Sequence, residues 1–447
     1  MLDNALSNRQ AHGEGNPLPE SETVIASTTS GKVRGRKRDG SYYFGAIPYA
    51  SASRFEKPRP VEPFSDVFDA TAPGTVFPQP PSRLERIMGP PHPDPEQSED
   101  SFTVTITTPS LTGSRPVMVW LHGGGYSSGG GSLPWYDGGS LSSEGDVVVV
   151  SVNYRVGVLG YLLLDGVTEG NLGVHDQITA LEWVRENIEA FGGNRDSVTV
   201  FGQSAGAHSI VNLLSSNNSR TLFHRAILQS TPRTDLNFTQ AAAIENGKTF
   251  ARLLDSDPRT APLPHILDAF RGTAIEFSRR SPNVVQPPFA PIAELAPVAR
   301  TFGAAPDVIV GYTRDEGSAF LRDVAGAPDP ERVAEKALTQ NMFAEPAMEL
   351  ADAFTEAGAS VYTYRFDWTP TDNVFGATHC IELPFVLGTE QSWHRSPMLG
   401  SSDWPSIDAL GRRVRRHWTT FAHTGSPDSS ETWEKYTSAQ PIGITFS

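Results

Sequence analysis

The chain has 447 residues and carries 36 basic against 51 acidic side chains, a formal net charge of −15. This balance argues against nucleic acids and anionic membrane surfaces as partners. The single cysteine, Cys380, excludes an internal disulfide. The first residues lack the apolar core of a signal peptide, and no apolar run approaches the length of a membrane span, so a cytoplasmic location is expected.

The sequence divides into an N-terminal extension, one domain and segments inserted into that domain. Residues 1–22 are polar and contain glycine, proline and glutamate, which predicts a disordered N-terminal extension. Residues 23–447 are expected to form a single domain. Inserted segments are expected at about 73–97, 255–300 and 318–360, and the proline-rich stretch 255–297 shows little helix signal.

Strand and helix signals alternate through the rest of the chain, which favours a mainly parallel central sheet. The clearest helix signal covers 174–191, where apolar residues recur every three or four positions and a glycine pair follows. A second helix is expected near 407–421. Strands are expected at roughly 103–108, 117–122, 147–153, 197–202, 225–229, 307–311 and 361–366.

Three consecutive glycines follow an early strand signal, in the run His122-Gly123-Gly124-Gly125-Tyr126. A loop of this type supplies part of the oxyanion hole in serine hydrolases. Its rigid backbone N–H groups stabilise a developing negative charge, and glycine lets the backbone approach closely. The alternative interpretation is a flexible glycine loop with no catalytic role.

The segment Gly202-Gln203-Ser204-Ala205-Gly206 lies between a strand signal at 197–201 and a helix signal at 207–214. A Gly-x-Ser-x-Gly in this position predicts a nucleophile elbow, a tight turn that lifts the serine hydroxyl to the top of a parallel sheet. The next backbone N–H then stands at the start of a helix. The alternative is a serine flanked by glycines in an ordinary loop.

With these two motifs, the chain resembles the type-B carboxylesterase family, which includes bacterial p-nitrobenzyl esterases and the cholinesterases. The resemblance implies an α/β-hydrolase fold, with a mainly parallel sheet and helices on both faces. It also implies that 23–447 is a single catalytic domain and that the inserted segments at about 73–97, 255–300 and 318–360 form the walls of a substrate gorge. It implies a serine carboxylesterase that forms an acyl-enzyme on Ser204 without a cofactor or metal. Further segments carry the resemblance, at 31–35, 44–50, 98–100, 152–157, 170–177 and 191–206.

The resemblance also implies the remaining site residues. In the hydrolase order the acid follows the serine and the histidine follows the acid. Glu316 lies in a matching Asp-Glu-Gly segment, with Asp315 as the local competitor, and His379 lies in a matching segment at 376–385. The oxyanion hole is expected to use the N–H groups of Gly124, Gly125 and Ala205.

Other residues are expected around this triad. Ser230 matches a family serine near the acid and the histidine, although a strand-end serine that bonds to the backbone is the alternative. His208 is expected beside the pocket. Cys380 is expected to point away from Ser204 along extended backbone and to be unreactive. Candidate pocket-wall residues are Tyr126, Trp135, Phe289, Phe320 and Phe375.

The expected substrate is a small-molecule ester, and the expected assembly is a monomer, with a dimer as the alternative. The same triad also serves amidases, carbamate hydrolases and lactonases, which stay open as alternatives. A catalytically silent interaction protein is disfavoured, because serine, glutamate and histidine are all present.

Overall fold

The computed structural model describes residues 22–447, apart from 39, 217–218, 234–235, 282–285, 294–304, 322–331 and 429. Residues 1–21 of the expected N-terminal extension therefore lie outside the described residues. None of the described helices is both long and apolar enough to cross a membrane.

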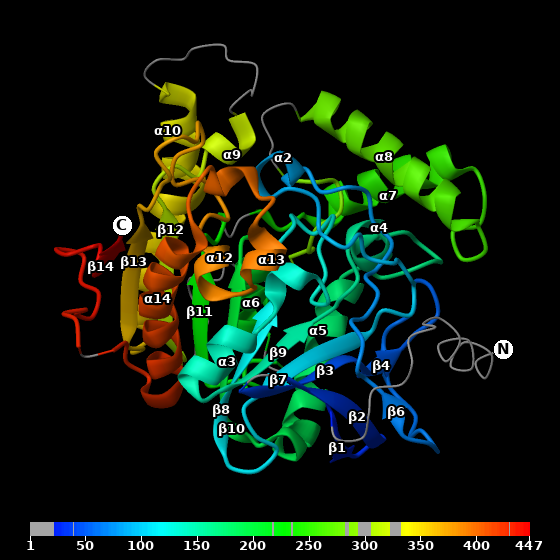
Figure 1. Ribbon diagram of the computed structural model, residues 1–447. Helices are drawn as coiled ribbons and strands as arrows, with labels where there is room; N and C mark the ends of the chain where they lie inside the picture. Colours follow the sequence, from blue (N-terminus) through cyan, green and yellow to red (C-terminus); the bar gives the residue numbers. More distant parts are fainter. Residues whose placement is uncertain are drawn as a thin grey trace.

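Within the described residues, twelve strands form one large sheet (Figure 1). Its spatial order is β1-β2-β3-β7-β9-β8-β10-β11-β12-β13-β14, and β6 pairs with β2. The strands are β1 (Thr23–Thr28), β2 (Gly31–Arg38), β3 (Ser41–Pro48), β6 (Phe68–Asp69), β7 (Thr103–Thr108), β8 (Arg115–Leu121), β9 (Val148–Val152), β10 (Gly193–Gln203), β11 (Arg225–Gln229), β12 (Asp307–Thr313), β13 (Val361–Phe366) and β14 (Ile444–Phe446). Two further short strands, β4 (Ala50–Ser51) and β5 (Arg59–Pro60), pair with each other.

The sheet has an antiparallel and a parallel part. Strands β1, β2, β3, β7 and β9 pair antiparallel, whereas every pairing from β9 through β8 and β10 to β14 is parallel. Parallel neighbours bring their carboxyl ends to the same edge of the sheet, where open α/β sheets bind their ligands. The loops that follow β8, β10 and β12 therefore meet at one edge.

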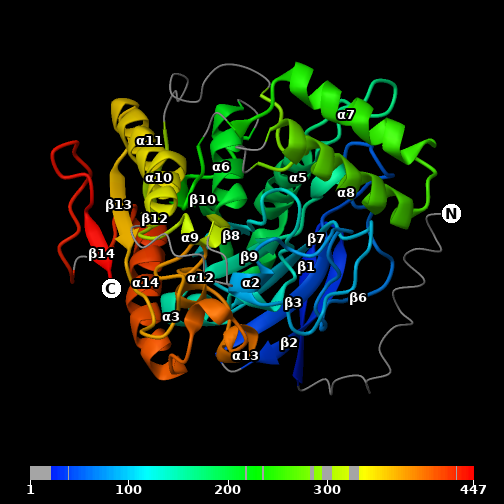
Figure 2. The ribbon, with the colours of Figure 1, turned by 90° about the horizontal axis from the view of Figure 1, so that it is seen from above.

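Helices cover both faces of the sheet (Figure 2). The longer helices are α3 (Gly139–Gly145), α5 (Leu172–Asn187), α6 (Ala205–Ser215), α7 (Gln240–Leu254), α8 (Leu263–Arg280), α10 (Val333–Thr339), α11 (Glu345–Glu356) and α14 (Trp404–Thr424). The shorter ones are α2 (Glu85–Met88), α4 (Gly157–Tyr161), α9 (Ser318–Leu321), α12 (Leu383–Val386) and α13 (Glu390–Trp393).

Side chains alternate between the two faces along β8. Val117, Val119 and Leu121 join one hydrophobic core with α5, α6 and α11. Met118 and Trp120 join another core with α3 and α14.

The expected strands and the two expected helices occur at their predicted places, although α5 ends at Asn187 and a 3₁₀ turn continues it over Ile188–Phe191. The expectation of little helix in 255–297 is wrong, because α8 occupies Leu263–Arg280. Its prolines, Pro262 and Pro264, lie at the N-cap and in the first turn, where a missing N–H costs nothing.

Candidate active site

Ser204 lies at the turn between β10 and α6, with φ 56° and ψ −122°. This left-handed backbone is rare for a residue with a side chain and indicates local strain. The neighbouring glycines are sterically required: a Cβ on Gly206 would stand 2.0 Å from the carbonyl oxygen of Leu121, and one on Gly202 would stand 2.7 Å from the same atom. The Gly-x-Ser-x-Gly segment thus forms the tight strand–turn–helix that its sequence predicts.

His379 and Glu316 form a buried pair. Nδ1 of His379 bonds to Oε2 of Glu316, and both side chains are 0 % exposed. The other carboxylate oxygen, Oε1, accepts the backbone N–H of Thr313 at 2.8 Å. Burial on its own lowers the pKa of His379, but the Glu316 carboxylate bonded to its Nδ1 outweighs this and holds that pKa well above its usual value.

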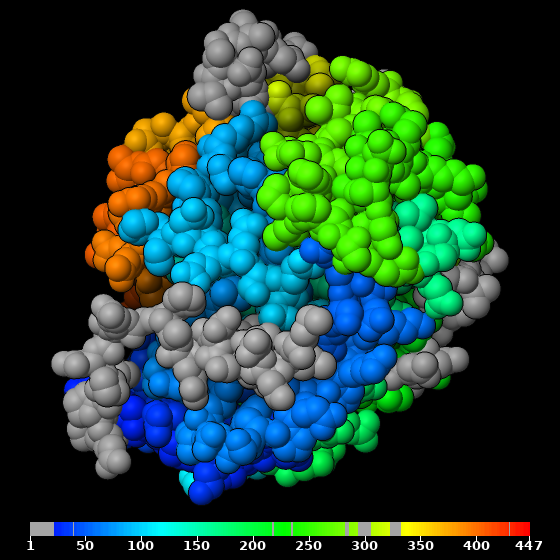
Figure 3. Space-filling model, turned by 90° about the vertical axis from the view of Figure 1, so that its right-hand side faces the viewer, coloured from blue at the N-terminus to red at the C-terminus, as the bar shows by residue number. Residues whose placement is uncertain are grey.

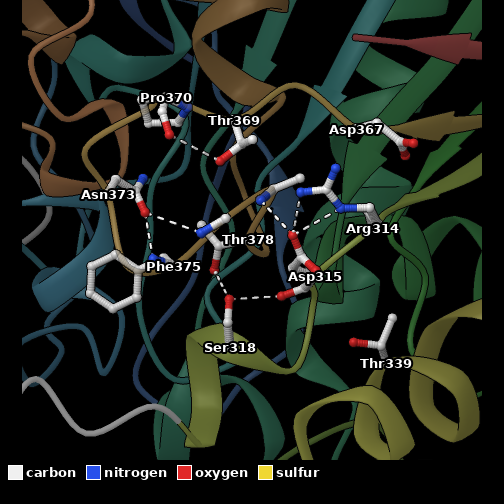
Figure 4. Close-up of polar contacts among 12 residues, drawn as sticks. Arg314, Asp315, Ser318, Thr339, Asp367, Thr369, Pro370, Asn373, Phe375 and Thr378 are labelled. Carbon is white, nitrogen blue, oxygen red and sulfur yellow. Dashed lines mark hydrogen bonds and ion pairs between the residues drawn. The ribbon is translucent and has the colours of Figure 1, made fainter. Parts of the chain in front are cut away.

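Hydrogen bonds between neighbouring residues connect the two loops that carry this pair, and Figure 4 shows those of Asp315, Ser318 and Thr378. The N–H of Asp315 donates to the carbonyl of Ala377 at 2.8 Å, and the N–H of Ala377 donates to the Asp315 carboxylate at 2.9 Å. Ser318 bonds to the carbonyl of Asp315 and to the hydroxyl of Thr378. The Asp315 carboxylate also pairs with Arg314, so Asp315 faces away from the histidine that Glu316 contacts.

The second ring nitrogen of His379 faces Gln203. Nε2 lies 3.2 Å from the side-chain nitrogen of Gln203. Among the described residues, no hydrogen bond joins this Nε2 to the hydroxyl of Ser204, although both residues line one cavity. Such bonds are often long in a free enzyme and tighten when substrate binds.

The glycine loop after β8 lines the same cavity as Ser204. Gly124 and Gly125 have φ of 107° and 59°, values that strongly favour glycine. The carbonyl of Gly124 accepts the N–H groups of Ser127 and Ser128. Within the described residues, the N–H groups of Gly124 and Gly125 donate no hydrogen bond, and Ala205 begins α6 beside them. These donors are therefore available to an oxygen bound next to Ser204.

The cavity has a volume of about 620 Å³ and is largely apolar. Residues of all three segments that were expected as gorge walls line it, within 80–86, 270–288 and 319–343. Tyr126 and His208 line it as well, and the Tyr126 hydroxyl bonds to Nδ1 of His208 at 2.7 Å. Phe320 and Phe343 pack on the ring of His379, with centroids 5.2 and 5.0 Å away.

Three of the five predicted wall residues belong to hydrophobic cores instead. Trp135 stacks on Trp393, with ring centroids 5.6 Å apart. Phe289 packs edge-on against Phe250, and Phe375 is 5 % exposed in the core on the α14 side. Aromatic residues close to a motif in sequence are as readily used for packing as for lining a pocket.

Ser230 and Glu382 form a second buried polar contact near the triad. The hydroxyl of Ser230 donates to Oε1 of Glu382 at 3.3 Å, so the serine bonds to a side chain and not only to the backbone. Burial and the nearby Glu316 carboxylate raise the pKa of Glu382 to about 7. Sequence reasoning missed Glu382, although one acidic residue in the apolar run 380–387 was an available signal.

Cys380 is buried, as expected, but the predicted reason is wrong. Its φ is 73°, so the chain is in a left-handed turn and not in extended backbone. Its thiol lies 3.6 Å from Oε1 of Gln203 and does not line the cavity that Ser204 faces. Burial raises the pKa of the thiol, which disfavours the reactive thiolate.

The mainly parallel sheet, the strained serine turn and the cavity at the strand ends define an α/β-hydrolase. Solved structures agree: a thermophilic p-nitrobenzyl esterase superposes with a TM-score of 0.82 at 33% identity, covering 92% of this chain and 93% of that one. The model of the carboxylesterase family matches residues 21–340 and 330–444. The chain belongs to this family and is a carboxylic ester hydrolase that acts on small-molecule esters.

Two relatives have informative names. A probable N-octanoylanthranilate hydrolase of Rhodococcus erythropolis is 43% identical over 427 residues, which cover 90% of this chain and 93% of that protein. The para-nitrobenzyl esterase of Bacillus subtilis is 35% identical over 459 residues, with 92% of each protein covered. The resemblance to the carboxylesterases seen in the sequence is thereby confirmed.

Proposed function

We propose that the chain hydrolyses carboxylic esters through an acyl-enzyme on Ser204. His379 takes the hydroxyl proton through Nε2 as Ser204 attacks the acyl carbon, and returns it to the leaving alcohol. Water then attacks the acyl-enzyme by the same route. Glu316 keeps the proton of the neutral ring on Nδ1, so that Nε2 can accept, and stabilises the imidazolium that forms.

The N–H groups of Gly124, Gly125 and Ala205 bind the oxyanion of the tetrahedral intermediate. They stabilise the charge without reorganising, because loop and helix hold them in place beforehand. The observation that carries the proposal is that Ser204, His379 and this glycine loop open onto one cavity, with His379 already paired to Glu316. This arrangement supports the assignment of a general base, a nucleophile and an oxyanion site to neighbouring groups.

The test is Ser204→Ala, assayed on p-nitrophenyl esters of increasing acyl length. We expect kcat to fall by about 10⁴- to 10⁶-fold with the fold unchanged. The matched control is Ser215→Ala, at the end of the helix α6 that follows Ser204; its hydroxyl bonds to the Val211 carbonyl. A fluorophosphonate should label the wild-type protein at Ser204 and nowhere else. Labelling of another serine, or turnover near normal in Ser204→Ala, would contradict the proposal.

A second activity, cleavage of N-acylated aromatic amines, is favoured by the relative named as an N-octanoylanthranilate hydrolase. An amide differs from an ester in its poorer leaving group, which His379 would protonate as the bond breaks. The test compares N-octanoylanthranilate with phenyl octanoate on the wild-type protein and on Ser204→Ala. Amide turnover that disappears in the variant supports this activity, and turnover of the ester alone limits the enzyme to esters.

A further inference from the structure

The described part of the cavity wall carries arginines in a protein whose net charge is −15. Among the described residues that line it, three are arginines, Arg83, Arg86 and Arg271, and none is an aspartate or glutamate. Arg271 pairs with Asp268 at 2.5 Å, and Arg86 donates to the carbonyl of Ala319 at 2.7 Å. A pocket with one sign of charge and low-dielectric walls concentrates ligands of the opposite sign. Arg271 is balanced by Asp268, so among the described lining residues Arg83 and Arg86 are the ones that favour an anionic substrate.

Arg83 stands closest to the proposed chemistry. It belongs to the expected wall segment 73–97, just before α2, and Figure 3 shows this segment (light blue) beside the green helices α7 and α8. Its Nη2 lies 3.1 Å from the point that a Cβ on Gly125 would occupy. The guanidinium thus lies against the loop whose N–H groups face the acyl oxygen. A group bound there would be only a few bonds from the scissile carbonyl.

The surroundings of Arg83 suit an anion. The residue is exposed to solvent at the cavity, while the protein around it removes enough water to lower the pKa of its guanidinium. A carboxylate bound beside it would favour the charged form of the guanidinium. A guanidinium presents parallel N–H donors that match the two oxygens of a carboxylate.

We infer that Arg83 binds a carboxylate carried by the substrate next to the bond that is cleaved. The substrates are then acyl derivatives of a short or aromatic hydroxy acid, with the carboxylate adjacent to the ester oxygen. Phe270, Phe277, Phe320 and Phe343 give the rest of the cavity an apolar lining that suits an acyl chain. The inference rests on the proposed function, because it assumes that the acyl oxygen lies at Gly125.

The test uses three esters that share one acyl chain: 2-(hexanoyloxy)benzoate, its neutral methyl ester, and 4-(hexanoyloxy)benzoate, whose carboxylate is displaced. For Arg83→Gln we expect kcat/KM to fall about 10- to 100-fold on the first ester, the size of a lost hydrogen bond between charged groups. The methyl ester and the displaced isomer should change less than about threefold, since neither places a carboxylate at Arg83. Arg83→Lys should retain part of the preference.

The matched control is Arg252→Gln, an exposed arginine that pairs with Glu276 outside the cavity, and it should leave all three esters unaffected. A second measurement needs no variant: salicylate should inhibit the wild-type protein at least about tenfold more strongly than the neutral salicylamide. Calorimetric titration of Ser204→Ala with salicylate, with and without Arg83→Gln, measures binding apart from turnover.

Equal losses on the neutral and the charged ester in Arg83→Gln would overturn the inference, because Arg83 would then act on the acyl oxygen or on the loop. Equal inhibition by salicylate and salicylamide would overturn it as well. Failure of the wild-type protein to cleave any of the three esters would count instead against the proposed function, so the two failures are distinguishable.

Discussion

Glu316→Gln tests the pairing of acid and histidine most sharply, because the structure dictates how the new amide must lie. Oε1 of Glu316 accepts the N–H of Thr313 at 2.8 Å in a fully buried site. A buried N–H without an acceptor is costly, so the amide oxygen of the glutamine keeps this bond. Its NH₂ group is then turned toward Nδ1 of His379, which must become the acceptor. The ring proton moves to Nε2, the atom that has to take the proton of Ser204.

The expected loss follows from this wrong tautomer. Replacing the acid of such a triad by its amide lowers kcat about 10⁴-fold, which corresponds to about 5.4 kcal/mol of lost transition-state stabilisation. The variant also lacks the carboxylate that raises the pKa of His379, so the acid limb of kcat/KM should move to lower pH. The assay is a pH series on a neutral p-nitrophenyl ester, with circular dichroism to check the fold.

Asp315→Asn is the matched control, one residue away. The asparagine oxygen can still accept the N–H of Ala377, and the ion pair with Arg314 is partly exposed. We expect a loss of less than about tenfold, because ion pairs open to solvent contribute little. Activity of Glu316→Gln within tenfold of wild type, or a larger loss in Asp315→Asn, would refute the tautomer argument.

Three further predictions concern pH, the thiol and the core. Because protonated His379 cannot accept a proton and its pKa is raised, kcat/KM should fall as the pH drops through a value above about 6.5, and full activity at pH 4 would contradict a histidine base. Cys380→Ala should keep most of the activity and lower the free energy of unfolding by about 1 kcal/mol. Iodoacetamide should leave the native enzyme active, because the thiol is buried and its pKa is raised. Rapid inactivation of the wild type but not of the variant would place the thiol at the active site. Asp176→Ala should lower the free energy of unfolding by about 3–5 kcal/mol, because it leaves the buried charge of Arg155 without its ion-pair partner. The Arg155 side chain is 4 % exposed and donates to Asp176 at 2.6 Å. A loss under about 1 kcal/mol in urea unfolding would contradict this prediction.

Much of the fold and the proximity of the main site residues could be predicted from the sequence, because those features depend on local signals. A Gly-x-Ser-x-Gly between a strand and a helix has few other solutions, since side chains at Gly202 and Gly206 would meet the backbone of Leu121. The order of serine, acid and histidine along the chain then limits the candidates for the acid and the general base to two short segments. Their buried contact, between Glu316 and His379, is what the structure adds.

The cavity walls could not be predicted in the same way. Whether an aromatic side chain lines a pocket depends on segments that are distant in sequence, as Phe343 against His379 and Trp135 against Trp393 illustrate. The prolines near α8 weaken the helix signal of 255–297, although their positions at the N-cap and in the first turn are compatible with a helix. Arg83 carried no sequence signal, because only the folded chain brings it to Gly125.

The sheet and the α8 side of the cavity wall pack in separate hydrophobic clusters, and this affects how readily the enzyme can acquire new substrates. The proposed reacting groups follow β8, β10, β12 and β13, whereas α8 and its neighbours form a third hydrophobic cluster apart from the two cores on the faces of the sheet. Substitutions in the wall segments therefore leave most of the packing that stabilises the sheet intact. A library of variants confined to 80–86 and 270–280 should keep a large fraction of folded members, so new substrate ranges can be reached in few steps without first adding stabilising mutations.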